Sequence, residues 1–154
     1  MRILYFTFLI AITVHGENWP MWRGTSGLGI SDDKNLPVEW SATNNITWKV
    51  QMPGRGNSTP IVWDEKILIT QPLEEKQERA LLCFDRLDGK LLWQRTVKYT
   101  APEESHRTNP YCSESPATDG ERIIAVYGSA GVFCYDLKGK ELWKRDLGKI
   151  SFEW

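Results

Sequence analysis

The chain has 154 residues, with 19 Lys and Arg against 20 Asp and Glu, which gives a formal net charge of −1. No basic run is interleaved with aromatic residues, so the electrostatic footprint of a nucleic-acid-binding protein is missing. The three cysteines are an odd number without a CxxC pair, which argues against a complete disulfide framework and against a zinc site.

Residues 1–16 have the pattern of a secretory signal peptide. Arg2 supplies a positive start, an apolar run follows from Ile3 to Val14, and Gly16 ends a small-residue cleavage site. The run is shorter than the roughly 20 apolar residues that span a bilayer, and no cysteine follows it that could carry a lipid. A buried N-terminal strand or helix is the alternative. We therefore expect an exported chain, periplasmic or extracellular, without a transmembrane segment in its mature form.

The segment that follows is predicted to be irregular at first and then extended. Residues 17–44 are rich in Gly, Ser, Trp and Pro, which favours an irregular surface segment. Residues 45–51 contain ITWKV, a partial copy of a tryptophan segment that recurs twice further along. We predict an outer β-strand there.

Two longer stretches repeat. CFDRLDGKLLWQR at 83–95 matches CYDLKGKELWKR at 134–145 with a one-residue gap, and TPIVWDEKILI at 59–69 matches SPATDGERIIA at 115–125. Self-similarity at a spacing of about 50 residues marks arrays of supersecondary units, either solenoids or propeller blades.

Each unit contains four short β-prone runs separated by turn residues, and no 3.6-residue apolar stripe is present. This pattern predicts an all-β chain in which four-stranded antiparallel blades build a partial β-propeller over residues 45–154. The expected blades cover residues 58–97 and 115–147. The expected strands are 61–63, 66–71, 80–85 and 90–97 in the first blade, and 117–118, 122–127, 132–137 and 141–146 in the second.

The residues that recur suggest structural roles. Trp93 and Trp143 are flat enough to stack between neighbouring sheets, with their N–H groups on backbone partners. Asp85 and Asp136 precede the turn into each Trp strand, where a carboxylate can accept backbone N–H bonds. Acid–base chemistry is the alternative for these carboxylates, although a repeated turn residue rarely has a single catalytic task. The turns themselves are completed by Gly89 and Gly139.

The Asp-x-x-x-Gly-x-x-x-Trp pattern of residues 85–93, and its shorter form at 136–143, resembles the tryptophan-docking repeat of the pyrroloquinoline-quinone-like, quinoprotein-type β-propeller family. Motifs along the mature chain are similar to the opening blades of an exported bacterial subgroup: WPMWRG, LPVEW, NITWKV, PGRGNSTPIVW and ATDGERII. The resemblance implies a closed ring of about seven or eight blades. Since only two complete units are present, we expect an N-terminal fragment of a longer protein, or ring closure by several copies.

Enzymes of that superfamily hold the quinone over the ring centre beside a calcium ion. The resemblance implies adjacent cysteines, an acidic calcium ligand and an aspartate base, yet the sequence has no Cys-Cys pair and no Asp or Glu that matches those roles. No cofactor is therefore evident. Pyrroloquinoline quinone (PQQ) with calcium belongs to an alternative interpretation, a PQQ-dependent oxidoreductase for alcohols or sugars.

The connectors before the first strand of each unit are the candidate binding site. In a propeller these loops emerge on one face, around the central funnel, and loops on a rigid scaffold often bind ligands. We expect side chains suited to an anionic group there: Arg55, Asn57, His106, Arg107 and Asn109. The alternative is that the polar residues cap turns and the cations lie in solvent. A histidine without an acidic orienting partner in the sequence is a weak general-base candidate.

Together these features predict a non-catalytic β-propeller repeat module of the bacterial cell envelope. It would bind a protein partner or a small ligand there. Besides the quinone-dependent oxidoreductase, a funnel that binds a small ligand or glycan remains open as an alternative.

Overall fold

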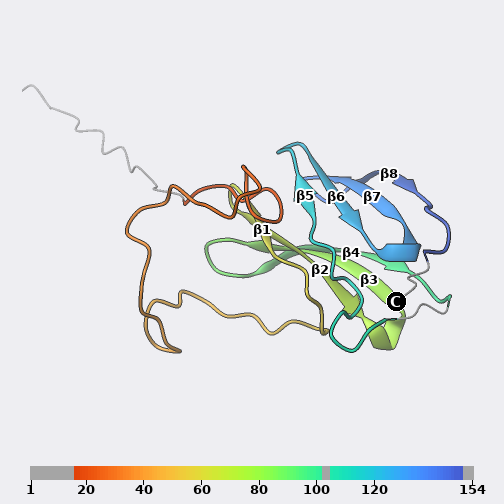
Figure 1. Cartoon of the computed structure of the whole chain (residues 1–154), viewed down its shortest axis with the longest axis horizontal. Helices are drawn as coiled ribbons and strands as arrows, with labels where there is room; N and C mark the ends of the chain where they lie inside the picture. Colours follow the sequence, from red (N-terminus) through yellow and green to blue (C-terminus); the bar gives the residue numbers. More distant parts are fainter. Residues whose placement is uncertain (1–15, 102–104, 151–154) are drawn as a thin grey trace, which may run out of the picture.

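The computed structural model describes residues 16–101 and 105–150, so the predicted signal segment lies outside the described residues except for Gly16. The prediction of an all-β partial propeller is confirmed, because two four-stranded antiparallel sheets make up the fold (Figure 1). The first sheet contains β1 (Ile61–Trp63), β2 (Lys66–Leu73), β3 (Glu78–Asp85) and β4 (Leu91–Lys98). The second contains β5 (Ala117–Thr118), β6 (Arg122–Val126), β7 (Val132–Asp136) and β8 (Glu141–Arg145).

In each blade the strands follow chain order and pair antiparallel with their neighbours. The β3–β4 ladder shifts register between Cys83 and Phe84, and the β7–β8 ladder shifts at the equivalent Cys134 and Tyr135. A bulge at the same place in both blades bends the strand just before the Asp-Gly turn. The sequence repeat is therefore a repeat of three-dimensional structure.

The first blade is longer than its sequence pattern predicts. The sequence predicts strands over residues 66–71 and 80–85, whereas β2 and β3 stay paired as far as Leu73 and Glu78. Only a single 3-10 turn, η1 (Glu74–Lys76), separates them, and Gln77 closes it at a φ of 53°. Pro72 and Arg79, which face each other in this extension of the ladder, are both buried.

The main hydrophobic core lies between the blades. One face of the first sheet packs against the second sheet, and Trp93 and Val97 of β4 pack against the same cluster. The buried residues of this cluster come from both sheets and from the connector between them: Ile61, Leu68, Leu81, Cys83, Cys112, Ile123, Ala125, Tyr127, Phe133 and Tyr135. Neither sheet could bury this face without its neighbour.

A tryptophan from one unit stacks on a glycine of the next. A Cβ atom placed on Gly139 would lie 2.9 Å from Cδ2 of Trp93, and one on Gly89 would lie 2.7 Å from Cδ2 of Trp48. Both glycines adopt positive φ, 78° and 74° respectively. Glycine is required on both counts, because it tolerates this conformation and leaves the ring room to touch the main chain.

The two stacked rings differ in how their N–H groups are bonded. Trp48 Nε1 donates to the carbonyl oxygen of Arg86 at 2.9 Å. Trp93 Nε1 is buried and has no hydrogen-bond partner among the described residues, so the expected backbone partner is missing there. The turn in the second blade is one residue shorter, and Arg95 donates from Nε to the Gly139 carbonyl oxygen.

The outer strand expected at residues 45–51 does not form, although this segment lies within the described part of the chain. The apolar side chains of this segment instead cover one face of the first sheet. Val50 and Met52 pack against Ala80, Leu82 and Phe84 on the face of the first sheet that points away from the second blade. The segment is extended but carries no ladder, because the described residues offer no strand beside it.

The N-terminal segment, expected to be irregular, nevertheless binds the inner edges of both blades (Figure 1). Trp19 exchanges two main-chain hydrogen bonds with Val62 of β1, at 2.8 and 2.9 Å. One residue later, the carbonyl oxygen of Pro20 accepts a bond from the N–H of Thr118 in β5, at 2.9 Å. We call residues 18–20 the strap, since they connect the first strand of one blade to the first strand of the other.

Because Trp93 is covered by the next blade whereas Trp143 is 44% exposed, the two repeat tryptophans form a matched pair. Trp93→Ala should lower the free energy of unfolding by about 3 kcal/mol, as expected for loss of a packed aromatic ring. Trp143→Ala should cost less than about 1 kcal/mol. Urea denaturation of the 154-residue chain measures both losses. Equal losses in the free energy of unfolding would show that the contact of Trp93 with Gly139 does not stabilise the fold.

Acid should weaken the turn between β5 and β6. Hydrogen bonds from the main-chain N–H groups of Arg122 and Glu121 lower the pKa of Asp119. A carboxyl whose pKa is lower in the folded state stabilises the fold above its unfolded pKa of about 3.9, and this contribution is lost as the pH falls through the folded value. Asp119→Asn should therefore lower the urea midpoint at pH 7 more than at about pH 2.5. Asp32→Asn, at an exposed carboxylate, serves as the control.

Candidate binding surface at the blade connectors

The two connectors that precede β1 and β5 lie against each other. Arg55 donates from Nη2 to the carbonyl oxygen of Arg107 at 3.0 Å, and Asn57 donates from Nδ2 to the carbonyl oxygen of Thr108 at 2.9 Å. The structure therefore brings together residues that are more than 50 positions apart in the sequence. We call residues 54–58 and 105–109 the connector surface.

The second connector is a tight turn with its own hydrogen bonds. His106 and Asn109 form an isolated antiparallel bridge, in which Asn109 N donates to the His106 carbonyl oxygen at 2.9 Å. The imidazole Nδ1 of His106 lies 2.7 Å from the Thr108 hydroxyl and accepts from Thr108 N at 3.3 Å. This ring nitrogen is thus used within the turn, while the residue as a whole remains exposed.

Hydrogen bonds below the surface fasten both connectors to the first blade. The Thr59 N–H donates to the Ser115 hydroxyl at 2.8 Å, and the Thr70 hydroxyl donates to the Glu114 carbonyl oxygen at 2.8 Å. Gly54 crosses the Pro72 carbonyl so closely that a Cβ atom there would lie 2.1 Å from its oxygen. The connector surface is therefore held by main-chain atoms on a rigid support.

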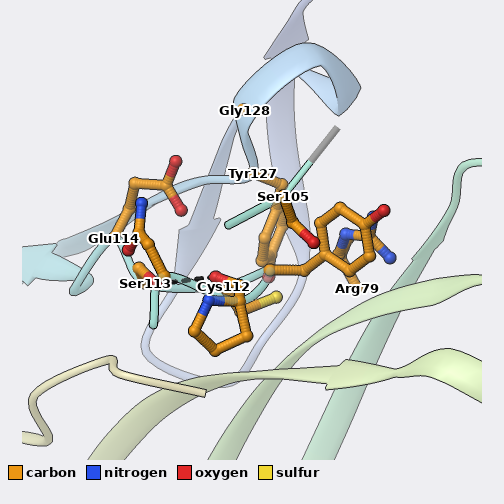
Figure 2. Close-up of a pocket in the computed structure, with 10 residues that line it drawn as sticks. Arg79, Ser105, Cys112, Ser113, Glu114, Tyr127 and Gly128 are labelled. Carbon is orange, nitrogen blue, oxygen red and sulfur yellow. Dashed lines mark hydrogen bonds between the residues drawn. The ribbon is translucent and has the colours of Figure 1, made fainter. Parts of the chain in front are cut away.

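A small cavity of about 60 Å³ lies beside the second connector (Figure 2). The guanidinium carbon of Arg79 sits 3.9 Å from the centre of the Tyr111 ring, a cation–π contact. Ser113 donates to the Pro110 carbonyl oxygen at 2.6 Å on the opposite wall. The lining residues are Arg79, Ser105, Asn109, Pro110, Tyr111, Cys112, Ser113, Glu114, Tyr127 and Gly128.

The hydroxyl of Tyr127 is the notable polar group of this cavity wall. It is buried and has no hydrogen-bond partner among residues 16–101 and 105–150. Burial raises the pKa of Tyr127 well above its ordinary value, so the phenol stays neutral.

All three cysteines are buried and free of disulfide bonds. Burial raises the pKa of Cys83 to about 12 and also raises that of Cys134. Because the thiolate is the form that attacks or ligates metals, both side chains are inert at neutral pH. They occupy the equivalent strand position of the two blades, each next to the bulge.

Metal-ligating side chains are scattered over the described part of the chain. Nowhere in residues 16–101 and 105–150 do three or more His, Cys, Asp or Glu side chains gather so that they could hold a metal ion. Cys83 lies in β3, Cys134 in β7 and Cys112 in the connector between the blades, so no two of them are adjacent in the sequence.

The repeated aspartates bind the turns in which they lie. Asp85 Oδ1 accepts from Leu87 N at 2.7 Å, and Asp136 Oδ1 accepts from Lys138 N and Lys140 N, each at 2.9 Å. These bonds fix the turns in which Gly89 lies against Trp48 and Gly139 lies against Trp93. Because their carboxylate oxygens accept hydrogen bonds from main-chain N–H groups of the turns, Asp85 and Asp136 have the contacts of structural turn residues.

Sequence reasoning missed Arg79, Tyr111 and Tyr127, which line the cavity with the expected Asn109. Arg79 was hidden in a charged stretch that resembles a solvent loop, and its burial follows only from the continued ladder of β2 and β3. The one available signal was the spacing of Arg79 two residues before the apolar Leu81, which places both on the same face of a strand.

Four-stranded antiparallel blades, joined by tryptophan stacking on glycine, define a β-propeller repeat protein. The family model described as outer membrane protein assembly factor BamB matches residues 25–151. The chain belongs to this family of PQQ-like repeat propellers. No curated protein matches it significantly. Among the described residues, no helix has the length and apolar character needed to cross a membrane.

Arg55 and Arg107 contribute differently to the contact between the connectors: Arg55 through its side chain and Arg107 through its main-chain carbonyl oxygen. Arg55→Ala removes a bond to a main-chain carbonyl and should lower the free energy of unfolding by about 1 kcal/mol. Arg107 contributes its carbonyl oxygen to that bond, so Arg107→Ala keeps the bond and should change stability by less than about 0.5 kcal/mol. Thermal unfolding of the two variants measures the difference. A larger loss for Arg107→Ala would contradict this account of the connectors.

Proposed function

We propose that this chain is a non-catalytic propeller module of the bacterial cell envelope and that its connector surface binds a protein partner. The observation that carries the proposal is the exposed connector surface, on which the side chains of Arg55 and Asn57 donate to the main-chain carbonyl groups of Arg107 and Thr108 and so fix this turn. The family description, an outer membrane protein assembly factor, supports the envelope and a role in protein assembly. The apolar run of residues 3–14 supports export.

The shape of this region favours a macromolecule over a small ligand. The cavity beside the second connector holds about 60 Å³, whereas pockets for small molecules usually measure about 300–1,000 Å³. Arg55 and Asn57 are turned onto main-chain carbonyls and so close the space between the connectors. A partner would therefore rest on the connector surface and would not enter it.

The chemistry of the connector surface suits a partner with carbonyl or carboxylate groups. Arg107 is an exposed cation on a turn that does not have to be ordered on binding. A preorganised loop avoids part of the entropy cost of association, and arginine is enriched among residues that dominate interface energies.

Charge reversal at one position tests the proposal. Arg107→Glu should reduce capture of envelope proteins by about tenfold or more, equivalent to about 1.4 kcal/mol of binding free energy. Lys34→Glu, a reversal at an exposed residue of the N-terminal segment, is the matched control and should leave capture unchanged. The measurement is quantitative mass spectrometry after cross-linked pull-down from envelope fractions, with thermal unfolding to verify both folds. Undiminished capture by Arg107→Glu would refute a role for the connector surface.

A further inference from the structure

The start of the described chain contains an arrangement of charges that propeller packing does not require. Both carboxylate oxygens of Asp33 face the main-chain nitrogen of Glu17, at 3.1 and 3.2 Å. Sixteen positions separate the two residues, so the contact closes a loop. A peptide nitrogen carries a single N–H, which these two oxygens must share.

The same loop is closed a second time by the side chain of Glu17. Its Oε2 accepts from the Ser31 hydroxyl at 2.7 Å and from Asp32 N at 3.1 Å. The Ser31 hydroxyl in turn accepts from Asp33 N at 3.1 Å, which orients the Asp33 carboxylate. Residue 17 is thus held through its nitrogen and its carboxylate together.

An ammonium group would fit this arrangement better than a peptide nitrogen. It offers three N–H donors, so each Asp33 oxygen could receive its own bond, and bonds between charged groups are shorter and stronger. Charged groups near this point include the Arg86 guanidinium, whose Nη2 would lie 2.6 Å from a Cβ on Gly16, the Glu17 carboxylate and the exposed Asp32, whose N–H donates to that carboxylate. Together with Asp33, these carboxylates outnumber the one guanidinium and leave the surroundings negative, which favours a cation.

The peptide bond between Gly16 and Glu17 lies where a leader peptidase would cleave. Cleavage sites of secretory signals end in small residues, and Gly16 follows Val14 and His15 after the apolar run. Cleavage occurs during export, before the chain folds, so the folded contacts need not admit an enzyme. The sequence pattern and the Asp33 contact therefore point to the same peptide bond from independent directions.

We propose that the chain is cut between Gly16 and Glu17 and that the Asp33 carboxylate binds the α-ammonium group so formed. Water is consumed in the cut: the Gly16–Glu17 C–N bond breaks, Gly16 leaves with a carboxylate, and the Glu17 amino group takes up a proton. The inference rests on the export that is part of the proposed function. Its consequence is structural, because the fixed terminus leads directly into the strap that binds β1 and β5.

The position of the cut is tested on the full chain. Expressed with residues 1–16 in an export-competent bacterium, the periplasmic protein should begin at Glu17 by intact-mass and N-terminal peptide analysis. A cut at another bond would overturn the inference but leave export intact. Recovery of the uncut chain from the cytosol would overturn export and the inference together. Neither result depends on the Arg107 capture experiment.

Capture of the ammonium group is tested on the protein that begins at Glu17. Asp33→Asn should lower its melting temperature by about 3–8 °C at pH 6.5. When the α-amino group is acetylated, the nitrogen again has one N–H and no charge, so the same substitution should cost less than half as much. Asp32→Asn, at the neighbouring exposed carboxylate, should leave both forms nearly unchanged. Equal losses in the free and acetylated forms would overturn the proposal.

If Asp33→Asn does not fold, the free and acetylated forms of the unsubstituted protein can be compared instead. The free form should melt above the acetylated form below about pH 7.7, the ordinary pKa of an α-amino group. Binding to a carboxylate raises the pKa of the ammonium in the folded state, so the difference should close as the pH rises through that higher value. Identical melting curves from pH 6 to 8 would refute capture by Asp33.

Discussion

The fold depends on an indole ring that lies flat against a glycine of the next unit. Trp48 on Gly89 and Trp93 on Gly139 repeat this contact at the two junctions that the described residues contain. Any side chain at the glycine would collide with the ring, and the positive φ that carries the turn past it would be strained for another residue. One contact thus fixes both the spacing and the orientation of successive sheets.

The candidate binding surface exists only because the blades are fixed in this way. Its two halves come from different blades, and they meet through side-chain donors on main-chain carbonyls. Each half alone would be a short polar loop. Supported by the shared core beneath, they form a single surface whose shape is set by the packing of β-sheets and does not have to be created by a partner.

Two segments outside the sheets cover parts of the blades: one lies along strand edges and the other on a sheet face. The strap adds hydrogen bonds along the inner edges of β1 and β5, where exposed strand edges would otherwise remain. Val50 and Met52 cover the face of the first sheet that has no blade beside it among the described residues. Both segments do for this part of the chain what neighbouring blades do for one another.

The repeated unit, its four strands and a position for Trp93 between neighbouring sheets could be predicted from the sequence alone, because alternation and turn chemistry act locally. The contact of the Trp93 ring with Gly139 could not, because it depends on how the two blades pack. The sequence also predicted that Arg55, Asn57, His106, Arg107 and Asn109 lie on one face, since equivalent loops of a repeat emerge together. Only the tertiary structure decided that Arg55 bonds to a carbonyl, that Arg79 is buried beside Tyr111, and that residues 45–51 cover a sheet face without forming a strand. These outcomes depend on which neighbour a segment meets, and a pattern that repeats every second residue is the same for a paired strand and for an extended chain lying on a sheet.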